Sequence, residues 1–253
     1  MRRVFDFAGT ATLFGLRVTT AAFLRPYEWN QIWTLIGNLG TRSLSLVASC
    51  GLALGVVMTL HTRGTLTMFG ATGLIPKVQS LGFFVEIGPL LAALLVAGRV
   101  GAGIGAVLAD MRATEQIDAI EALSIDSFKF LVVPRVVACV LVLPLLTTFM
   151  DCCGIVGGYV SSYALSRISW HLYVARAFTN MAWSNFVPPT LKTAVFGFII
   201  GTVSCFFGYT TNEGADGVGR AATNSVVVSS LLIVLADVIL VKLILLFFPG
   251  SAL

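Results

Sequence analysis

Six ionisable residues lie inside apolar stretches; Asp151 and Lys242 stay unassigned, and the other four could take part in transport or in chemistry. Glu86 lies about five residues inside one stretch, and Lys192 about three residues inside another. Arg99 follows Glu86 after some thirteen residues, and Asp237 lies near the middle of the last apolar stretch. Because a charge inside a membrane is costly, such residues mark a substrate pathway, a relay or a structural bond.

Other candidate motifs do not have the residues that catalysis would need. Residues 214–221 nearly match the phosphate-binding pattern GxxxxGK[ST], but Arg220 replaces the lysine, Ala221 replaces the hydroxyl, and no strand precedes them. The glycines therefore predict a tight turn. His61 and His171 are isolated, and the five cysteines show no metal-ligand spacing. We expect no catalytic residue, no metal site and no cofactor on this chain.

The composition assigns these residues to a membrane protein. Hydrophobic residues make up 57% of the 253 residues and charged residues 11%, and the mean hydropathy is +0.93. A soluble domain has about 25% charged residues. The net charge of +4 is spread along the chain instead of clustered. These values exclude a soluble enzyme, a disordered tail and a nucleic-acid-binding domain.

Five stretches are apolar and long enough to cross a bilayer, which takes about 20 residues. The predicted fold is an all-α integral membrane protein. An amphipathic helix in the headgroup region precedes the first span, with a frayed leader as the alternative. A short helix or a solvated loop is expected over 166–187, on the outer surface. The predicted spans are residues 43–62, 81–108, 129–163, 189–210 and 225–248.

Basic residues predict the orientation of the spans. They are more frequent before the first span, between spans two and three, and between spans four and five than in the other loops. We therefore expect the amino end in the cytoplasm and the carboxyl end in the periplasm. The basic residues on the predicted cytoplasmic side are Arg2, Arg3, Arg17, Arg25, Arg42, Arg112, Lys129, Arg135 and Arg220.

On this topology, Glu86 and Lys192 enter from the same side and reach nearly the same depth, at about 1.5 Å per residue. We predict that they form a polar gate near the outer leaflet, within one subunit or across a dimer. Each side chain could instead extend to the interface on its own. For Arg99 and Asp237 a structural bond is favoured over a transport role, and their partners stay open.

The longest polar interruption, residues 110–127, lies between two predicted cytoplasmic ends. Thr114 is expected to cap a short helix whose apolar ridge runs beside an acidic stripe. Spacing alone leaves two roles open: docking in a partner's groove, or packing on the chain's own membrane domain. The ridge consists of Ile117, Ile120 and Leu123, and the stripe of Glu115, Asp118 and Glu121.

An ordered set of motifs resembles the MlaE (YrbE) family of ABC-transporter permeases over about residues 80–223. The motifs are EIGP at 86–89, AGRVGA at 97–102, MRATEQIDA at 111–119, VPR at 133–135, and segments 208–209 and 214–223. One departure is Asp126-Ser127, where the family often has Asp-Pro, which predicts a looser turn.

The resemblance implies one permease domain over 1–253, with an interfacial region at 1–42, five spans within 43–248 and a coupling helix loop at 110–127. It implies a homodimer in the bacterial inner membrane that moves phospholipids or related lipids. Its partners would be an MCE-domain protein on the periplasmic side and a separate ATPase, which carries the ATP and Mg²⁺. The coupling residues would be Thr114, Glu115, Gln116, Ile117, Asp118, Ile120, Glu121 and Leu123.

Two other functions are considered beside this permease. A secondary carrier for a hydrophobic solute would need no ATPase, and it typically shows paired repeats or broken helices, which the sequence lacks. An intramembrane lipid-modifying enzyme would need a cluster of metal-binding aspartates, which is also absent. The permease is therefore the favoured prediction.

Overall fold

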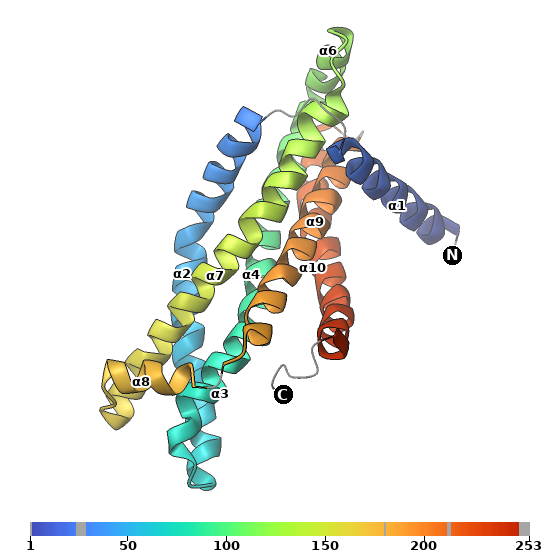
Figure 1. Cartoon of the computed structure of the whole chain (residues 1–253). Coiled ribbons are helices and arrows are strands. Elements are labelled where there is room, and N and C mark those ends of the chain that lie inside the picture. The colour runs from blue at the N-terminus through green and yellow to red at the C-terminus, as the bar shows by residue number, and fades with distance from the viewer. Residues whose placement is uncertain (1, 24–28, 180, 212–213, 248–253) are drawn as a thin grey trace. The chain divides into compact units, whose positions relative to one another are not determined.

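The computed structural model describes residues 2–23, 29–179, 181–211 and 214–247, which form helices joined by short turns (Figure 1). These residues contain no strand, which confirms the all-α prediction. The α-helices are α1 (Arg2–Phe23), α2 (Trp29–Met68), α3 (Ile75–Gly82), α4 (Gly88–Val96), α5 (Ala102–Ala113), α6 (Gln116–Ala122), α7 (Val133–Ser166), α8 (Trp170–Ala177), α9 (Val187–Tyr209) and α10 (Gly214–Phe247).

Five helical segments are apolar and long enough to cross a membrane, as the sequence predicts. They are Trp29–Met68, Thr72–Ala113, Phe128–Ser166, Trp183–Tyr209 and Gly214–Phe247. The helices extend beyond the predicted spans because polar residues at their ends continue the same helix. Residue 25 and the predicted end of the last span at residue 248 lie outside the described residues.

Three short π-helical turns interrupt the second and third spans: η2 (Phe83–Ile87), η3 (Ala97–Gly101) and η4 (Phe128–Val132). Such turns are rare and recur at functional sites. Here η2 contains Glu86 and η3 contains Arg99, while Arg135 follows η4 by three residues. Two 3₁₀ turns, η1 (Thr72–Leu74) and η5 (Trp183–Asn185), begin the second and fourth spans.

Contacts between Cα atoms divide the chain into two compact units. Unit 1 comprises Met1–Arg42, Leu94–Leu143 and Ala194–Leu235. In its interior, Phe14 of α1 meets Phe128 edge-on at a centroid distance of 5.1 Å and Phe206 at 5.5 Å. The Arg17 guanidinium lies 4.4 Å from the centre of the Phe128 ring. Helix α1 is therefore fastened by aromatic contacts, and its position in the headgroup region stays a prediction.

Unit 2 comprises Ser43–Ala93, Pro144–Thr193 and Ala236–Leu253. Here α2 and α7 approach so closely that a Cβ on Gly55 would overlap the backbone carbonyl of Gly154. Small residues permit this close approach of two helix backbones. The short helix expected within 166–187 is present as α8, where Tyr173 is fully buried.

The glycine-rich segment 214–221 differs from its prediction. It forms the first two turns of α10 instead of a tight turn, and only Gly214 at its start has a left-handed backbone, with φ of 57°. A glycine adopts this conformation without steric cost, so it can begin the helix after a change in chain direction. Ala215, Arg220, Ala221 and Ala222, which have high helix propensity, favour a continuing helix.

Candidate functional site

Three charged side chains from three different spans meet in unit 2. Lys192 Nζ of α9 lies 3.0 Å from Glu86 Oε2 of η2 and 2.9 Å from Asp237 Oδ1 of α10. The Lys192 side chain is 1% exposed, that of Asp237 6% and that of Glu86 40%. The Lys192 ammonium group thus pairs with two carboxylates. The Asp237 carboxylate is buried, and the Glu86 carboxylate is partly exposed.

The neighbouring sequence explains how these groups are placed. Glu86 lies in a wide π-turn before Gly88 and Pro89, and Lys192 lies one turn inside α9, which begins at Val187. A glutamate inside a continuous apolar helix would be costly without a partner. The predicted meeting of Glu86 and Lys192 is present within one chain, and its role as a gate stays a prediction.

Asp237 and Arg99 have different surroundings. Asp237 binds Lys192, a partner that the sequence did not identify. Arg99 in η3 is exposed, and among the described residues it forms no ion pair. The sequence gives the depth of each residue along its helix, but the helix face that meets a partner depends on how the helices pack, and for Arg99 also on the π-turn in which it lies.

A second buried carboxyl group, Asp151 of α7, was left unassigned by the sequence. Its side chain is fully buried, and neither oxygen has a hydrogen-bond partner among the described residues. It lies directly against the Cα of Gly88, where a Cβ would overlap Oδ1. An ionised carboxylate would be strongly disfavoured in this position. The contact explains why the residue at position 88 must be a glycine.

A hydrogen-bonded network around Gln79 of α3 was also not predicted. Gln79 Oε1 accepts bonds of 2.8 Å from Thr59 of α2 and from the Tyr173 hydroxyl of α8. Its Nε2 donates to the backbone carbonyls of Gly154 and Gly55, at 3.3 and 3.4 Å. Burial raises the pKa of the Tyr173 phenol, which stays a donor at neutral pH. This network joins four helices of unit 2.

The predicted coupling segment is a sharp turn followed by the short helix α6. Thr114 does not cap α6: its hydroxyl donates to the Asp110 carbonyl at 2.8 Å, which completes the end of α5. Glu115 takes the N-cap position instead, with a left-handed φ of 58°. The prediction that Thr114 caps this helix was wrong, because its hydroxyl donates to a carbonyl of the preceding helix α5 instead of accepting from an amide of α6.

Three contacts hold helix α6 to the rest of unit 1. Ile117 is fully buried. Arg112 Nη1 lies 2.7 Å from Asp118 Oδ1. The Glu121 carboxylate accepts hydrogen bonds from the hydroxyls of Ser127, at 2.5 Å, and Tyr209, at 3.2 Å. The Ser127 hydroxyl lowers the pKa of Glu121.

Ser127 therefore does the opposite of what its departure from the family pattern predicted. Its buried hydroxyl binds both Glu121 and Tyr209, and Asp126 Oδ1 accepts from the backbone amides of Phe128 and Lys129. Proline could not donate the bond that serine makes. The turn after α6 is tied by side-chain bonds, and the expectation of a looser turn was wrong.

The remaining surface of α6 is exposed. Leu123 is 73% exposed, and Glu115, Gln116 and Asp118 are exposed as well. The predicted apolar ridge is thus divided between two environments: Ile117 packs on the chain's own domain, Ile120 is half-buried, and Leu123 is open. Of the two roles left open by the spacing, packing on the chain's own domain is present at Ile117, and docking in a partner's groove stays a prediction.

The fold and the buried ion cluster define a multi-pass α-helical membrane protein whose charged groups hold one another inside apolar helices. The sequence profile of the family described as Permease MlaE matches residues 32–243. The chain belongs to this family, and it is a membrane permease of an ABC transporter, a transporter subunit and not an enzyme.

Similar proteins support this assignment over most of the chain. A probable ABC transporter permease protein of Rickettsia bellii is 37% identical over 93% of this chain and 91% of its own length. A probable ABC transporter permease protein of Synechocystis sp. is 38% identical over 79% of this chain and 76% of its own. Protein TRIGALACTOSYLDIACYLGLYCEROL 1, chloroplastic, of Arabidopsis thaliana is 32% identical over 88% of this chain and 63% of its own.

Proposed function

We propose that this chain moves phospholipids or related lipids between membranes, driven by a separate ATPase that carries the ATP and Mg²⁺. The observation that carries the proposal is the half-exposed Glu86 carboxylate on a fully buried lysine, inside helices that are otherwise apolar. Such a polar group suits a lipid headgroup, while the apolar helices suit acyl chains of varied length. The Arabidopsis relative also carries the name of a diacylglycerol lipid.

In this mechanism the Glu86–Lys192 pair is a gate. While the pair is closed, Lys192 has two carboxylate partners and no free direction for an anionic headgroup. Movement of Glu86 would expose the ammonium to a lipid phosphate, and Asp237 would keep Lys192 in place. Because Glu86 is the exposed partner, its separation from Lys192 costs less than the separation of Asp237.

The gate is tested by transport of a fluorescent phospholipid between vesicles, with the permease and its ATPase reconstituted together. We expect E86A and K192A to lose most of the transport. K242A is the matched control, since Lys242 is an exposed cation on α10 outside the ion cluster. Full transport by both E86A and K192A would contradict the gate.

The exposed residues of α6 are proposed as the surface that the ATPase grips. The contacts of Ile117, Asp118 and Glu121 fix α6 to the rest of unit 1. A coupling helix needs such a rigid connection to transmit a movement of the ATPase to the membrane domain. A photo-crosslinker at Glu115 or Leu123 should capture the ATPase in working cells. The same crosslinker at the buried Ile117 is the control and should capture only its own chain.

A second copy of the chain and an MCE-domain protein complete the proposed assembly. Helix α10 supports the homodimer because it is apolar and largely uncovered, with Leu235, Val238 and Ile239 each more than 60% exposed. A long apolar helix face of this kind is typical of an interface or of contact with lipid. We propose the bacterial inner membrane as the location, with the amino end in the cytoplasm and the MCE-domain protein on the periplasmic side.

ABC-permease membership favours this function over a secondary carrier, which would need no ATPase, and over a lipid-modifying enzyme. The discriminating measurement is transport in reconstituted vesicles with and without ATP. Transport that persists without ATP and follows an ion gradient would contradict the proposal.

A further inference from the structure

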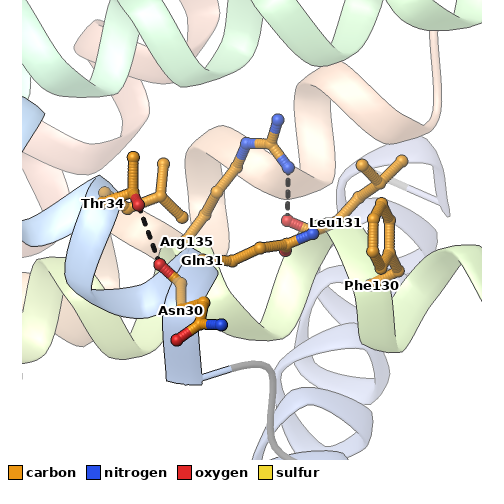
Figure 2. Close-up of a pocket in the computed structure, with 7 residues that line it drawn as sticks. Asn30, Gln31, Thr34, Phe130, Leu131 and Arg135 are labelled. Atoms are coloured by element: carbon orange, nitrogen blue, oxygen red, sulfur yellow. Dashed lines mark hydrogen bonds between the residues drawn. The ribbon is translucent and has the colours of Figure 1, made fainter.

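A pocket of about 440 Å³ lies within unit 1, between the beginning of α2 on one side and η4 with the first turn of α7 on the other (Figure 2). It is separate from the gate, which lies in unit 2. Three of its residues carry uncharged polar side chains, three are apolar, and one is cationic. The lining residues are Asn30, Gln31, Thr34, Leu35, Phe130, Leu131 and Arg135.

Arg135 provides the charge of the pocket. Its side chain is half-buried, and Nη1 donates a 2.6 Å hydrogen bond to the Leu131 carbonyl one turn earlier. A guanidinium has five N–H donors in a fixed planar arrangement. Among the described residues no carboxylate forms an ion pair with Arg135, and no acidic residue lines the pocket. A partly buried cation without a counter-ion is costly, so the pocket is suited to an anion.

The other side chains complete a site with a polar and an apolar part. In Figure 2, Asn30, Gln31 and Thr34 lie on α2. Phe130 and Leu131 of η4 and Arg135 of α7 lie across the pocket from them. The Thr34 hydroxyl is used inside its helix, where it donates to the Asn30 carbonyl at 2.8 Å. The side-chain amides of Asn30 and Gln31 have N–H groups that can donate to an anionic oxygen. Leu35, Phe130 and Leu131 offer an apolar wall beside them.

The position of the pocket along the spans points to a membrane lipid as the source of the anion. Its residues lie where the first and third spans begin, which is the same side of the membrane. On α2 the neighbouring Trp29 and Trp33 are 56% and 67% exposed. Exposed tryptophans at the end of a span are typical of the headgroup level of a bilayer. On the predicted topology this level belongs to the cytoplasmic leaflet.

We propose that this pocket binds the phosphate of a membrane phospholipid, with the Arg135 guanidinium as its counter-ion. The planar fork of arginine matches two oxygens of a phosphate, which a lysine cannot do. The amides of Asn30 and Gln31 bind the polar part of the headgroup, and the apolar wall contacts the glycerol and the first carbons of the chains. The proposal depends on membrane insertion and not on transport, so it can succeed or fail independently of the gate.

Native mass spectrometry of the full chain in detergent, titrated with dioleoylphosphatidylglycerol, measures this binding. R135A should weaken binding at least about tenfold, which corresponds to about 1.4 kcal/mol, because it removes a charge-assisted hydrogen bond. R135K keeps the charge and should lose about threefold. K129A is the matched control, because Lys129 lies six residues earlier and outside the pocket lining, and it should bind as the wild type does.

Two further ligands distinguish the source of the phosphate. Dioleoylglycerol, which has the same chains and no phosphate, should bind the wild type much more weakly, and R135A should not change its binding. Inorganic phosphate at about 10 mM, with salt added to about 0.15 M ionic strength, should not displace the phospholipid. Displacement by inorganic phosphate would overturn the assignment to a lipid, and equally tight binding of dioleoylglycerol would overturn the phosphate contact.

A variant that keeps Arg135 covers the case in which R135A does not fold. L35W fills the pocket from α2 and should reduce phospholipid binding while the protein stays folded. If both R135K and L35W bind the phospholipid as the wild type does, the pocket is not the site. Equal weakening in K129A and R135A would show general attraction to positive charge and would also overturn the proposal.

Discussion

Removal of the Lys192 charge tests whether the ion cluster is a buried, mutually dependent unit. In K192M the methionine occupies a similar volume without the ammonium, and two carboxylates are left facing the same space. Asp237, at 6% exposure, then lacks its counter-ion, while Glu86, at 40% exposure, can still be reached by water. The expected loss of stability comes chiefly from Asp237.

The magnitude follows from burial. Removing one partner from a buried ion pair costs about 3–5 kcal/mol, whereas an exposed pair contributes about 0–1 kcal/mol. We therefore expect K192M to lose about 3–5 kcal/mol and E86Q at most about 1 kcal/mol. D237N should lie between them at about 1–3 kcal/mol, since Lys192 keeps Glu86 as a partner and the amide oxygen can still accept a hydrogen bond.

Reversible unfolding in mixed micelles gives these values, and the double variant K192M/D237N completes a thermodynamic cycle. The double variant no longer has a buried, unpaired carboxylate, so it should be more stable than K192M alone. Equal stability of K192M and E86Q would refute the argument from burial. A double variant that loses the sum of the two single losses would show that Lys192 and Asp237 are independent.

Three further changes test the contacts around this site and α6. G55A should destabilise the protein by about 1–3 kcal/mol because its Cβ would overlap the Gly154 carbonyl, whereas G64A on the same helix has open space; thermal unfolding compares the two. Y173F removes one buried hydrogen bond and should cost about 0.5–1.5 kcal/mol in the same assay. For Glu121 the pKa is lowered in the folded state, so its stabilisation of α6 is present at neutral pH and lost as the pH falls below the ordinary range of a glutamate. The protection factors of the α6 amides, which are corrected for the slower intrinsic exchange at low pH, should fall under acid in the wild type, and E121Q should remove this pH dependence.

The number of spans could be predicted from the sequence because it depends on length and apolar composition alone. The pairing of Glu86 with Lys192 also followed, since a shared depth along two helices is given by counting residues. The partner of Asp237 did not follow. Asp237 and Lys192 lie on α10 and α9, and which faces of these two helices meet is decided by packing that residue counting does not give.

The details of α6 show a second limit. Thr114 has a good capping side chain, and the position before Glu115 is plausible for a helix start. Its hydroxyl instead bonds to the preceding helix, and the left-handed Glu115 makes the turn. Similarly, the bonds of Ser127 depend on Tyr209, which lies 82 residues later in the chain. Local sequence cannot show such a partner, because the bond exists only after distant helices have packed.

The two cationic sites differ in what surrounds them, and this difference suits them to different tasks in the lipid transport that we propose. Lys192 has two carboxylates within 3.0 Å, so an anionic headgroup can reach it only after Glu86 has moved away. Arg135 has a backbone carbonyl as its bonded partner, which leaves most of its donors open. The pocket at Arg135 can therefore hold a phosphate without rearrangement, whereas binding at Lys192 requires the separation of an ion pair. A site of the first kind suits a lipid held in place, and a site of the second kind suits a step that must be driven.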